Sequence, residues 1–411
     1  MIKRILFLII ITASSTAFPD TNSLFDDLKG FGKNTVGGLD GLTYRVTSTE
    51  DYLRGDESPV PGTLRWGIEE TSGPVWIVFD PDVFPVEVEQ AIYLKQSLAL
   101  RDNVTIDGRG SQVAIKRRYD WSVAEWNEIK EDVYECEIFP HFKSDRSLYG
   151  AILKLRSTKN IIISHIKFEQ EMQGEERHPG KLKDSQCFGD AIQIYNLALN
   201  DNPNSSHQGN SYFDNIWINR STFSSCKDEC VGITRSSTIA RSHLTISHNL
   251  FQDSYKGILI GNENDIDIGS ELKLVVSLYE NHFLNIRQRS PRVANAYVHF
   301  FNNWVQNWNG YGVAASRSTR VILEQNIFTA MSDPHDPWQM FPGASNGYLW
   351  AQNNQFHHVD KPENYTTRSF PKANLNGGPW YYDDQLAKDL TDLSEEEIEQ
   401  YFLETAGWRH H

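Results

Sequence analysis

A short string of alternating apolar residues recurs along this 411-residue chain and constrains its fold more than any other feature. Each string ends in an aromatic residue or valine, and in the best copies an asparagine stands two positions before that end. The best copies cover residues 244–251, 276–283, 298–305, 321–328 and 349–356, and their asparagines are Asn249, Asn281, Asn303, Asn326 and Asn354. Two earlier strings, 161–168 and 216–223, have Ile166 and Ser221 in the asparagine position. The asparagines therefore form one column, spaced by 32, 22, 23 and 28 residues.

Alternation with a period of two predicts strands, and recurrence about every 20 to 30 residues predicts a solenoid. We expect an all-β fold, a right-handed single-stranded parallel β-helix, with a repeat core over about residues 100–357. In such a fold each coil buries its inner edge on its neighbours. The asparagine column is expected to form a ladder whose side-chain amides bond between coils and satisfy backbone groups at a bend.

Helices are expected only at the two ends of the solenoid. Residues 63–70 follow a Pro-Gly turn and predict a short helix that caps the first end. Near the C-terminus, Ser394 and Glu397 form a capping box before an amphipathic helix that runs to about Thr405. This helix belongs to a tail of about residues 358–411, which we expect to cover the last coil.

The first 17 residues have the features of an export signal. Lys3 and Arg4 precede the apolar run 5–11, and small residues up to Ala17 form a cleavage site. The run is too short to span a bilayer. We therefore expect residues 18–411 to form one secreted or periplasmic domain that is monomeric and does not associate with a membrane.

The cysteine content agrees with an extracytoplasmic location, and the net charge limits which polymers the protein could bind. The four cysteines allow three pairings in an oxidising environment, and they are Cys136, Cys187, Cys226 and Cys230. The net charge is −15, so the chain is not expected to bind nucleic acid. An acidic polysaccharide would also be repelled at long range, so it would have to be held by a local basic groove or a bound cation.

Charged residues recur in consecutive coils of the repeat. Asp190 lies in GDAIQIY, Asp228 and Glu229 in CKDECVGI, Lys256 in YKGILIG, and Arg289 with Arg292 in RQRSPRV. Together with GFGKNTVGGLDG, PGTLRWGI and VTIDGRG, these segments resemble the pectate lyase and pectin lyase family over essentially residues 32–356. Each motif alone is weak, but their order along the repeat makes the resemblance specific.

The resemblance implies cleavage of a polyuronate by β-elimination. Arg289 matches the arginine that acts as base, and Lys256 matches the lysine that grips a substrate carboxylate. A free guanidinium stays protonated, so an arginine base needs neighbouring cations that disfavour its charge. Four further residues are candidates for binding the substrate: Arg287 and Arg292 as nearby cations, Trp308 as a sugar-stacking platform and Arg317 as an additional cation.

The resemblance also implies calcium, which prefers several oxygen ligands. The candidate ligands are Asp190, Asp228 and Glu229. Phe188 and Gly232 stand where the family has further acids, so we expect weak binding that the substrate's own carboxylates complete. Pectin lyases manage without calcium, and Lys227 is the candidate here for a basic replacement of the metal.

The sequence thus predicts a secreted polysaccharide lyase that acts on a homogalacturonan-like polyuronate and gives 4,5-unsaturated products. Three alternatives stay open. The first is a calcium-independent pectin lyase, and the second is a lyase of another uronate polymer. The third is a non-catalytic β-helix that binds acidic glycans, because a fold alone does not establish an activity.

Overall fold

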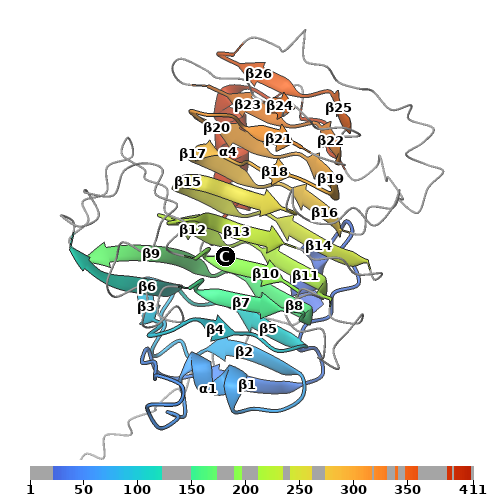
Figure 1. The fold of residues 1–411 in the computed structure, drawn as a ribbon. Helices are drawn as coiled ribbons and strands as arrows, with labels where there is room; N and C mark the ends of the chain where they lie inside the picture. The colour runs from blue at the N-terminus through green and yellow to red at the C-terminus, as the bar shows by residue number, and fades with distance from the viewer. Residues whose placement is uncertain are drawn as a thin grey trace, which may run out of the picture.

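The computed structural model describes residues 22–122, 150–173, 189–196, 212–234, 241–261, 274–316, 319–330, 338–340, 348–359, 387–390 and 393–408. Its strands stack in coils along one axis, from β1 at one end to β26 at the other (Figure 1). Neighbouring strands are parallel on each face of the stack. The prediction of an all-β parallel β-helix is therefore confirmed.

The first face is a sheet of ten strands within the described residues, ordered as they follow along the chain. Its strands are β1 (Leu42–Val46), β2 (Val75–Phe79), β5 (Val104–Asp107), β8 (Lys159–Ser164), β11 (Asp214–Asn219), β14 (Ser242–Ser247), β16 (Leu274–Tyr279), β19 (Ala296–Phe301), β22 (Arg320–Glu324) and β25 (Tyr348–Gln352). The sheet begins well before the expected start of the repeat core near residue 100. The strands β1 and β2 join this sheet by pairing, although they lack the asparagine column of the repeat.

The second face follows the first across a tight bend. Its strands are β3 (Gln90–Tyr93), β6 (Val113–Ser122), β9 (Lys167–Gln173), β12 (Thr222–Ser224), β15 (Leu250–Ile260), β17 (His282–Gln288), β20 (Trp304–Gln306), β23 (Ile327–Thr329) and β26 (Gln355–His357). The third face is formed by β4 (Leu98–Ala99), β7 (Leu153–Arg156), β10 (Ile192–Tyr195), β13 (Glu229–Thr234), the end of β15, β18 (Arg292–Val293), β21 (Val313–Ala315) and β24 (Trp338–Met340). The long strand β15 pairs on both faces and so joins them.

Alternation places one side chain in two inside the coils, and these side chains form a continuous core. One inward column on the first face shows the pattern, with residues paired in register from coil to coil. It consists of Ile106, Ile163, Ile218, Ile246, Leu278, Phe300 and Leu323. Each coil therefore buries its apolar edge on the coils before and after it.

The asparagine column forms the expected ladder at the bend between the first and second faces. The Asn249 amide donates to Asn281 Oδ1 at 3.0 Å, and Asn281 donates to Asn303 Oδ1 at 2.9 Å. The ladder continues through Asn326 to Asn354. Each amide also bonds a backbone carbonyl of a preceding coil, such as Ile246 O for Asn281. The residue before each ladder position has a positive φ, so the ladder satisfies backbone groups exposed by a sharp turn.

The aromatic column stacks inside the same bend. The rings of Phe168, Phe223, Phe251 and Phe283 stack with centroid separations of 5.2, 4.9 and 4.8 Å. These spacings match the distance between adjacent strands of a sheet, about 4.8 Å. The two columns read from the sequence are thus two linear stacks along the solenoid axis.

Two helices lie at the predicted positions in the chain. The helix α1 (Leu64–Glu69) is capped by Thr63, and Leu64 and Ile68 join the core beside the first coils, which confirms the predicted cap. The helix α4 (Glu395–Thr405) begins at the predicted capping box of Ser394. A short 3₁₀ turn, η1 (Asn22–Asp27), precedes the first strand. Among the described residues, no helix is both long and apolar enough to cross a bilayer.

The position of α4 differs from the expectation that it covers the last coil. Its Phe402 packs with Trp304 and Ile327 on the outside of the second face, and the helix lies along the flank of the stack (Figure 1). The backbone N–H of Gly407 donates to His248 O at 2.7 Å, several coils before the last. The helix α4 packs on apolar residues of this flank. Alternation alone would predict that these residues face the solvent.

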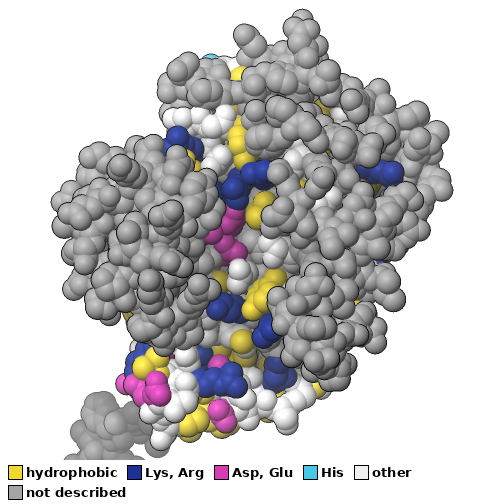
Figure 2. All heavy atoms as spheres, in the orientation of Figure 1, with side chains coloured by type: hydrophobic (Ala, Val, Ile, Leu, Met, Phe, Trp, Pro, Cys, Tyr) yellow, Lys and Arg dark blue, Asp and Glu magenta, His cyan; other side chains and the backbone are white. Residues whose placement is uncertain are grey.

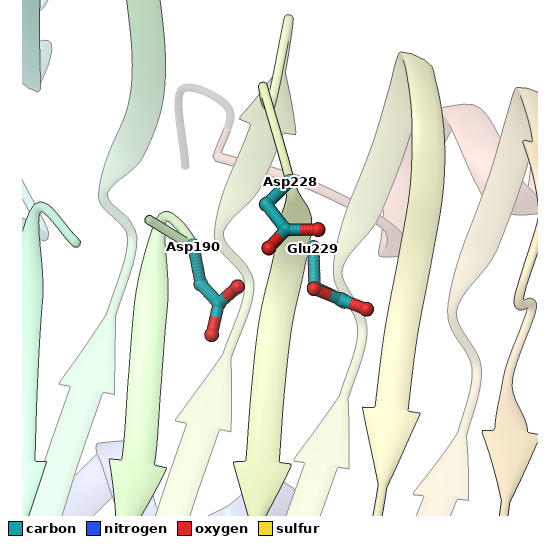
Figure 3. A group of neighbouring side chains, drawn as sticks. All are labelled: Asp190, Asp228 and Glu229. Carbon is teal, nitrogen blue, oxygen red and sulfur yellow. The ribbon is translucent and has the colours of Figure 1, made fainter. Parts of the chain in front are cut away.

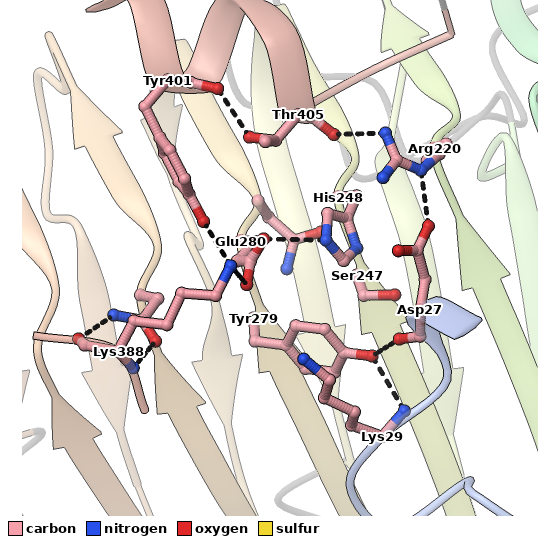
Figure 4. A network of polar contacts seen from close by, with 12 residues as sticks. Asp27, Lys29, Arg220, Ser247, His248, Tyr279, Glu280, Lys388, Tyr401 and Thr405 are labelled. Carbon is pink, nitrogen blue, oxygen red and sulfur yellow. Dashed lines mark hydrogen bonds and ion pairs between the residues drawn. The ribbon is translucent and has the colours of Figure 1, made fainter. Parts of the chain in front are cut away.

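A polar network fastens both ends of the described chain to this flank (Figure 4). Glu280 pairs with His248 at 2.8 Å and with Lys388 at 2.9 Å. Arg220 pairs with Asp27 at 2.6 Å and also donates to the carbonyl of Thr405 in α4. The flank therefore holds the N-terminal turn and α4 in place, and leaves the third face to form the candidate site.

Candidate active site

Three carboxylates meet on the third face where two neighbouring strands begin. Asp190 precedes β10, Asp228 precedes β13, and Glu229 is the first residue of β13. One oxygen of each lies within 4.8 Å of the others (Figure 3). A disulfide between Cys226 and Cys230 closes the turn that carries Asp228 and Glu229. The structure thus brings together the three residues predicted as metal ligands.

Gly232 makes the room that Asp190 occupies. A Cβ atom at position 232 would stand 2.0 Å from Asp190 Oδ2, which is closer than real Cβ contacts come. From the family resemblance, Gly232 stands where an acidic ligand would be expected. In the structure the absence of a side chain there lets the Asp190 carboxylate lie against β13.

Two cations from the next coils pair with these acids. Lys256 Nζ lies 2.8 Å from Asp228 Oδ1, and Arg289 forms an ion pair with Glu229. Lys256 stands opposite Glu229 on one side and Gln288 on the other in the strand register, so the acids and cations occupy consecutive coils. Only 1% of Lys256 is exposed, which places its charge inside the cluster rather than at a solvated strand end.

Burial opposes ionisation of the carboxyl groups in this cluster. Desolvation raises the pKa of Asp190 well above its ordinary value, the nearby Asp228 raises it further, and Lys256 and Arg289 oppose the shift. Desolvation also raises the pKa of Asp228, although the charge and hydrogen bond of Lys256 act against it. Added positive charge at this position would therefore stabilise the ionised carboxylates.

A turn between the second and third faces presents Arg289. The residue has φ 67°, in the left-handed region, directly after β17, and Ile258 N donates to its carbonyl at 2.6 Å. A Cβ atom at Gly257 would stand 2.5 Å from that carbonyl oxygen. Gly257, beside Lys256 in the motif YKGILIG, therefore allows the arginine turn to approach β15.

Two tyrosines complete the surroundings and were not identified from the sequence. The guanidinium of Arg287 lies 4.6 Å from the ring centroid of Tyr255, in cation–π geometry. Tyr311 is 7% exposed, and burial raises the pKa of its hydroxyl although Arg289 and Arg292 lower it. Their only sequence signal is position, since Tyr255 precedes Lys256 and Tyr311 follows the arginine coil.

The other predicted substrate residues have different outcomes. Arg292 is partly exposed on the third face, in register with Leu259 of β15. The prediction that Trp308 offers a stacking platform is wrong, because its ring is 3% exposed and packs edge-on against Phe328 in the core. Arg317 lies outside the described residues, as do Phe188, Cys136, Cys187 and the predicted export signal.

This arrangement can hold a cation and an anion side by side. Three carboxylates offer hard oxygen donors, and a lysine and an arginine stand next to them to receive a carboxylate. Acids and basic side chains are both visible on this face of the molecule, between regions drawn in grey (Figure 2). The chemistry such a site suits is one in which negative charge develops on a bound polyanion.

Comparisons with known proteins agree with the resemblance read from the sequence. The family model described as Pectate lyase matches residues 142–387. Pectate lyase 1 of Hesperocyparis arizonica is 28% identical over 313 residues, which cover 76% of this chain and 70% of the relative.

Solved structures show the same fold. Jun a 1, the major allergen from cedar pollen, superposes with a TM-score of 0.57 at 22% identity and covers 93% of both chains. The pectate lyase Bsp165PelA from Bacillus sp. N165, solved in complex with trigalacturonate, has a TM-score of 0.51 at 16% identity. That comparison covers 92% of this chain and 98% of the Bacillus protein.

Proposed function

This chain belongs to the pectate lyase family, and we propose that it cleaves pectate by β-elimination on the third face of its solenoid. It is a polysaccharide lyase. The observation that carries the assignment of the site is the pairing of Lys256 and Arg289 with a cluster of buried carboxylates in register on consecutive coils. Buried ionisable groups with perturbed pKa values, concentrated at a single point, favour a catalytic site.

In the proposed reaction a base removes the proton on C5 of a uronate, next to the C6 carboxylate. The electron pair of the broken C–H bond forms the C4–C5 double bond. The C4–O bond breaks, and the leaving oxygen takes up a proton, so one cleavage gives a 4,5-unsaturated product and one new chain end. Negative charge develops toward the C6 carboxylate, which must be held by positive groups.

In this proposal Lys256 holds that carboxylate, and Arg289 accepts the C5 proton. Arg289 is ion-paired with Glu229, so in this proposal the arginine exchanges this acid for the substrate before it acts as a base. Proton transfer by a positioned side chain typically contributes about 10²- to 10⁴-fold in rate.

The acidic cluster fits calcium by its donor atoms. Asp190, Asp228 and Glu229 each offer an oxygen within 4.8 Å of the others, and calcium takes about six to eight oxygens. If each residue gave one oxygen, several positions would stay open for carboxylates of the substrate, which is why we propose joint binding by protein and substrate. When bound, calcium would supply positive charge beside the reacting uronate. The residues Lys256 and Arg289 would then be free to turn from the acids to the substrate.

We propose that the protein acts outside the cytoplasm, because its polymeric substrate is too large to cross a membrane. The export signal at residues 1–17 supports this localisation. We also propose that the protein acts as a monomer, because a solenoid buries its core within one chain.

The test is the rise in ultraviolet absorbance that unsaturated product causes on polygalacturonate, for the wild-type protein and for Arg289→Ala. We expect a loss of at least about 10² in kcat with the fold retained. Arg45→Ala is the matched control, because Arg45 is also ion-paired but lies on the first face. Full activity in a folded Arg289→Ala protein would refute its role as base.

The substrates and a chelator separate the alternatives. Cleavage of esterified pectin that persists in excess chelator would favour a calcium-independent pectin lyase. Cleavage of alginate or glucuronan alone would favour a lyase of another uronate polymer. Binding of polygalacturonate without any cleavage would indicate a non-catalytic protein.

A further inference from the structure

A row of outward-facing residues runs along the third face through the candidate site. Lys154 on β7, Gln193 on β10, Gly232 on β13, Leu259 on β15 and Arg292 on β18 are consecutive partners in the strand register. Their chain neighbours on both sides point into the core wherever these are strand residues, so the row faces outward throughout. The row is therefore a straight track parallel to the solenoid axis.

The acidic cluster lies in the middle of this track. The Asp190 carboxylate rests against Gly232, and Lys256 precedes Leu259 by three residues on the same strand. Adjacent strands are about 4.8 Å apart, so Lys154 lies roughly 10 Å along the axis from Gly232 and roughly 14 Å from the strand of Lys256. Arg292 occupies the other side of the cluster.

Lys154 carries a charge that the described part of the protein does not neutralise. No ion pair joins it to a carboxylate among the described residues, although acids outnumber Lys and Arg by 15 in the whole chain. The charged group that acts on Lys154 is like-charged: it is the buried Arg117, whose guanidinium donates to Gly150 O at 2.8 Å. Burial and Arg117 both lower the pKa of the Lys154 ammonium. Arg156, two residues on and exposed on the same face, adds a second cation.

We propose that Lys154, assisted by Arg156, binds a carboxylate of the same polyuronate chain at a distal subsite. This inference rests on the proposed function and specifies the length of substrate that the site recognises. A hexuronate residue is about as long as one strand spacing and carries one carboxylate, so a chain on the track presents a carboxylate to Lys154 about three sugars from the reacting one. Short oligomers that occupy the reacting position cannot reach it.

The experiment compares Lys154→Gln with Lys33→Gln on long polygalacturonate and on digalacturonate and trigalacturonate. Lys33 is exposed and follows Gly32, whose N–H donates to Thr245 on the first face, so the control removes the same charge elsewhere. We expect Lys154→Gln to raise KM for the polymer about two- to fivefold with kcat within about twofold, the range of a partly exposed charge pair. Adding Arg156→Gln should enlarge the effect.

The inference is overturned if Lys154→Gln and Lys33→Gln have the same KM on the polymer, or if the penalty is equal on dimers and polymer. It is also overturned if the penalty is as large on methyl-esterified pectin, because a carboxylate would then not be the group recognised. Affinity electrophoresis in polygalacturonate, with both changes introduced into Arg289→Ala, measures binding without cleavage. A wild-type protein that cleaves no polyuronate would count against the proposed function, whereas this binding comparison would still decide the subsite.

Discussion

Gly232→Ala tests whether the space beside β13 is needed for the acidic cluster to work. The added Cβ would lie 2.0 Å from Asp190 Oδ2 and 2.8 Å from its Cγ. Contacts of this kind do not fall below 3.0 Å, so the carboxylate oxygen has to move by at least about 1 Å. The clash involves the end of a side chain and not the backbone, so we expect the coil to keep its fold and Asp190 to leave the cluster.

The size of the effect follows from what Asp190 contributes. It is one of three carboxylates that can hold a cation, and misplacing groups that orient metal ligands typically costs 10- to 100-fold in metal affinity. Each tenfold change corresponds to about 1.4 kcal/mol, so the expected loss is about 1.4 to 2.8 kcal/mol. The calcium concentration for half-maximal cleavage of polygalacturonate should rise by the same 10- to 100-fold.

The assay is a calcium titration of cleavage, paired with direct calcium binding by calorimetry in the absence of substrate. Asp190→Ala and the double variant complete a thermodynamic cycle, and Gly232→Ala should have almost no effect once Asp190 is gone. Gly310→Ala is the control, because its Cβ would meet only Arg287 O at 3.2 Å and Gln288 Cβ at 3.5 Å. An unchanged calcium requirement in Gly232→Ala, or an equal loss in the Asp190→Ala background, would refute the reasoning.

Two further predictions concern stability. Burial opposes ionisation of Glu280, yet hydrogen bonds from His248 and Lys388 hold its pKa well below the usual range. The ionised Glu280 therefore stabilises the fold at neutral pH, and this stabilisation is lost as pH falls below the unfolded-state pKa of about 4.3. Glu280→Gln should lower the free energy of unfolding by about 2 kcal/mol at pH 7 and by progressively less in acid, as measured by urea unfolding. A pH-independent difference would contradict this. Asn303→Ala should cost about 2 to 4 kcal/mol, because two buried ladder neighbours lose a partner, and Asn354→Ala should cost less since that residue is only partly buried. Equal melting temperatures for the two variants would contradict a cooperative ladder.

Much of the fold could be predicted because a solenoid is encoded locally. Each coil repeats its apolar alternation, its ladder position and its aromatic position within a few residues, so the columns of Asn281 and Phe283 are visible in the chain itself. A substitute such as Ser221 still fits, since its hydroxyl accepts from Ile166 N at 3.3 Å and its own N–H donates to Asn249 Oδ1 at 2.9 Å. The repeat does not extend to β1 and β2, which join the same sheet by pairing alone, so periodicity could not reveal them.

The candidate site was also only partly predictable from the sequence. The order of Asp190, Asp228, Lys256 and Arg289 along successive coils was readable, because the repeat converts chain order into spatial order. Which acid pairs with which cation depends on side chains from different coils meeting across the strand register.

By itself the sequence determined the coils, the two stacks at their bend and the family of the protein, because these depend on patterns that recur every coil. Only the tertiary structure decided three features that arise from contacts between distant segments. These are the burial of Trp308 in the core, the space that Gly232 leaves for Asp190, and the packing of α4 along the flank. The inside or outside position of one indole ring, and the free volume beside one carboxylate, depend on neighbours that no local pattern specifies.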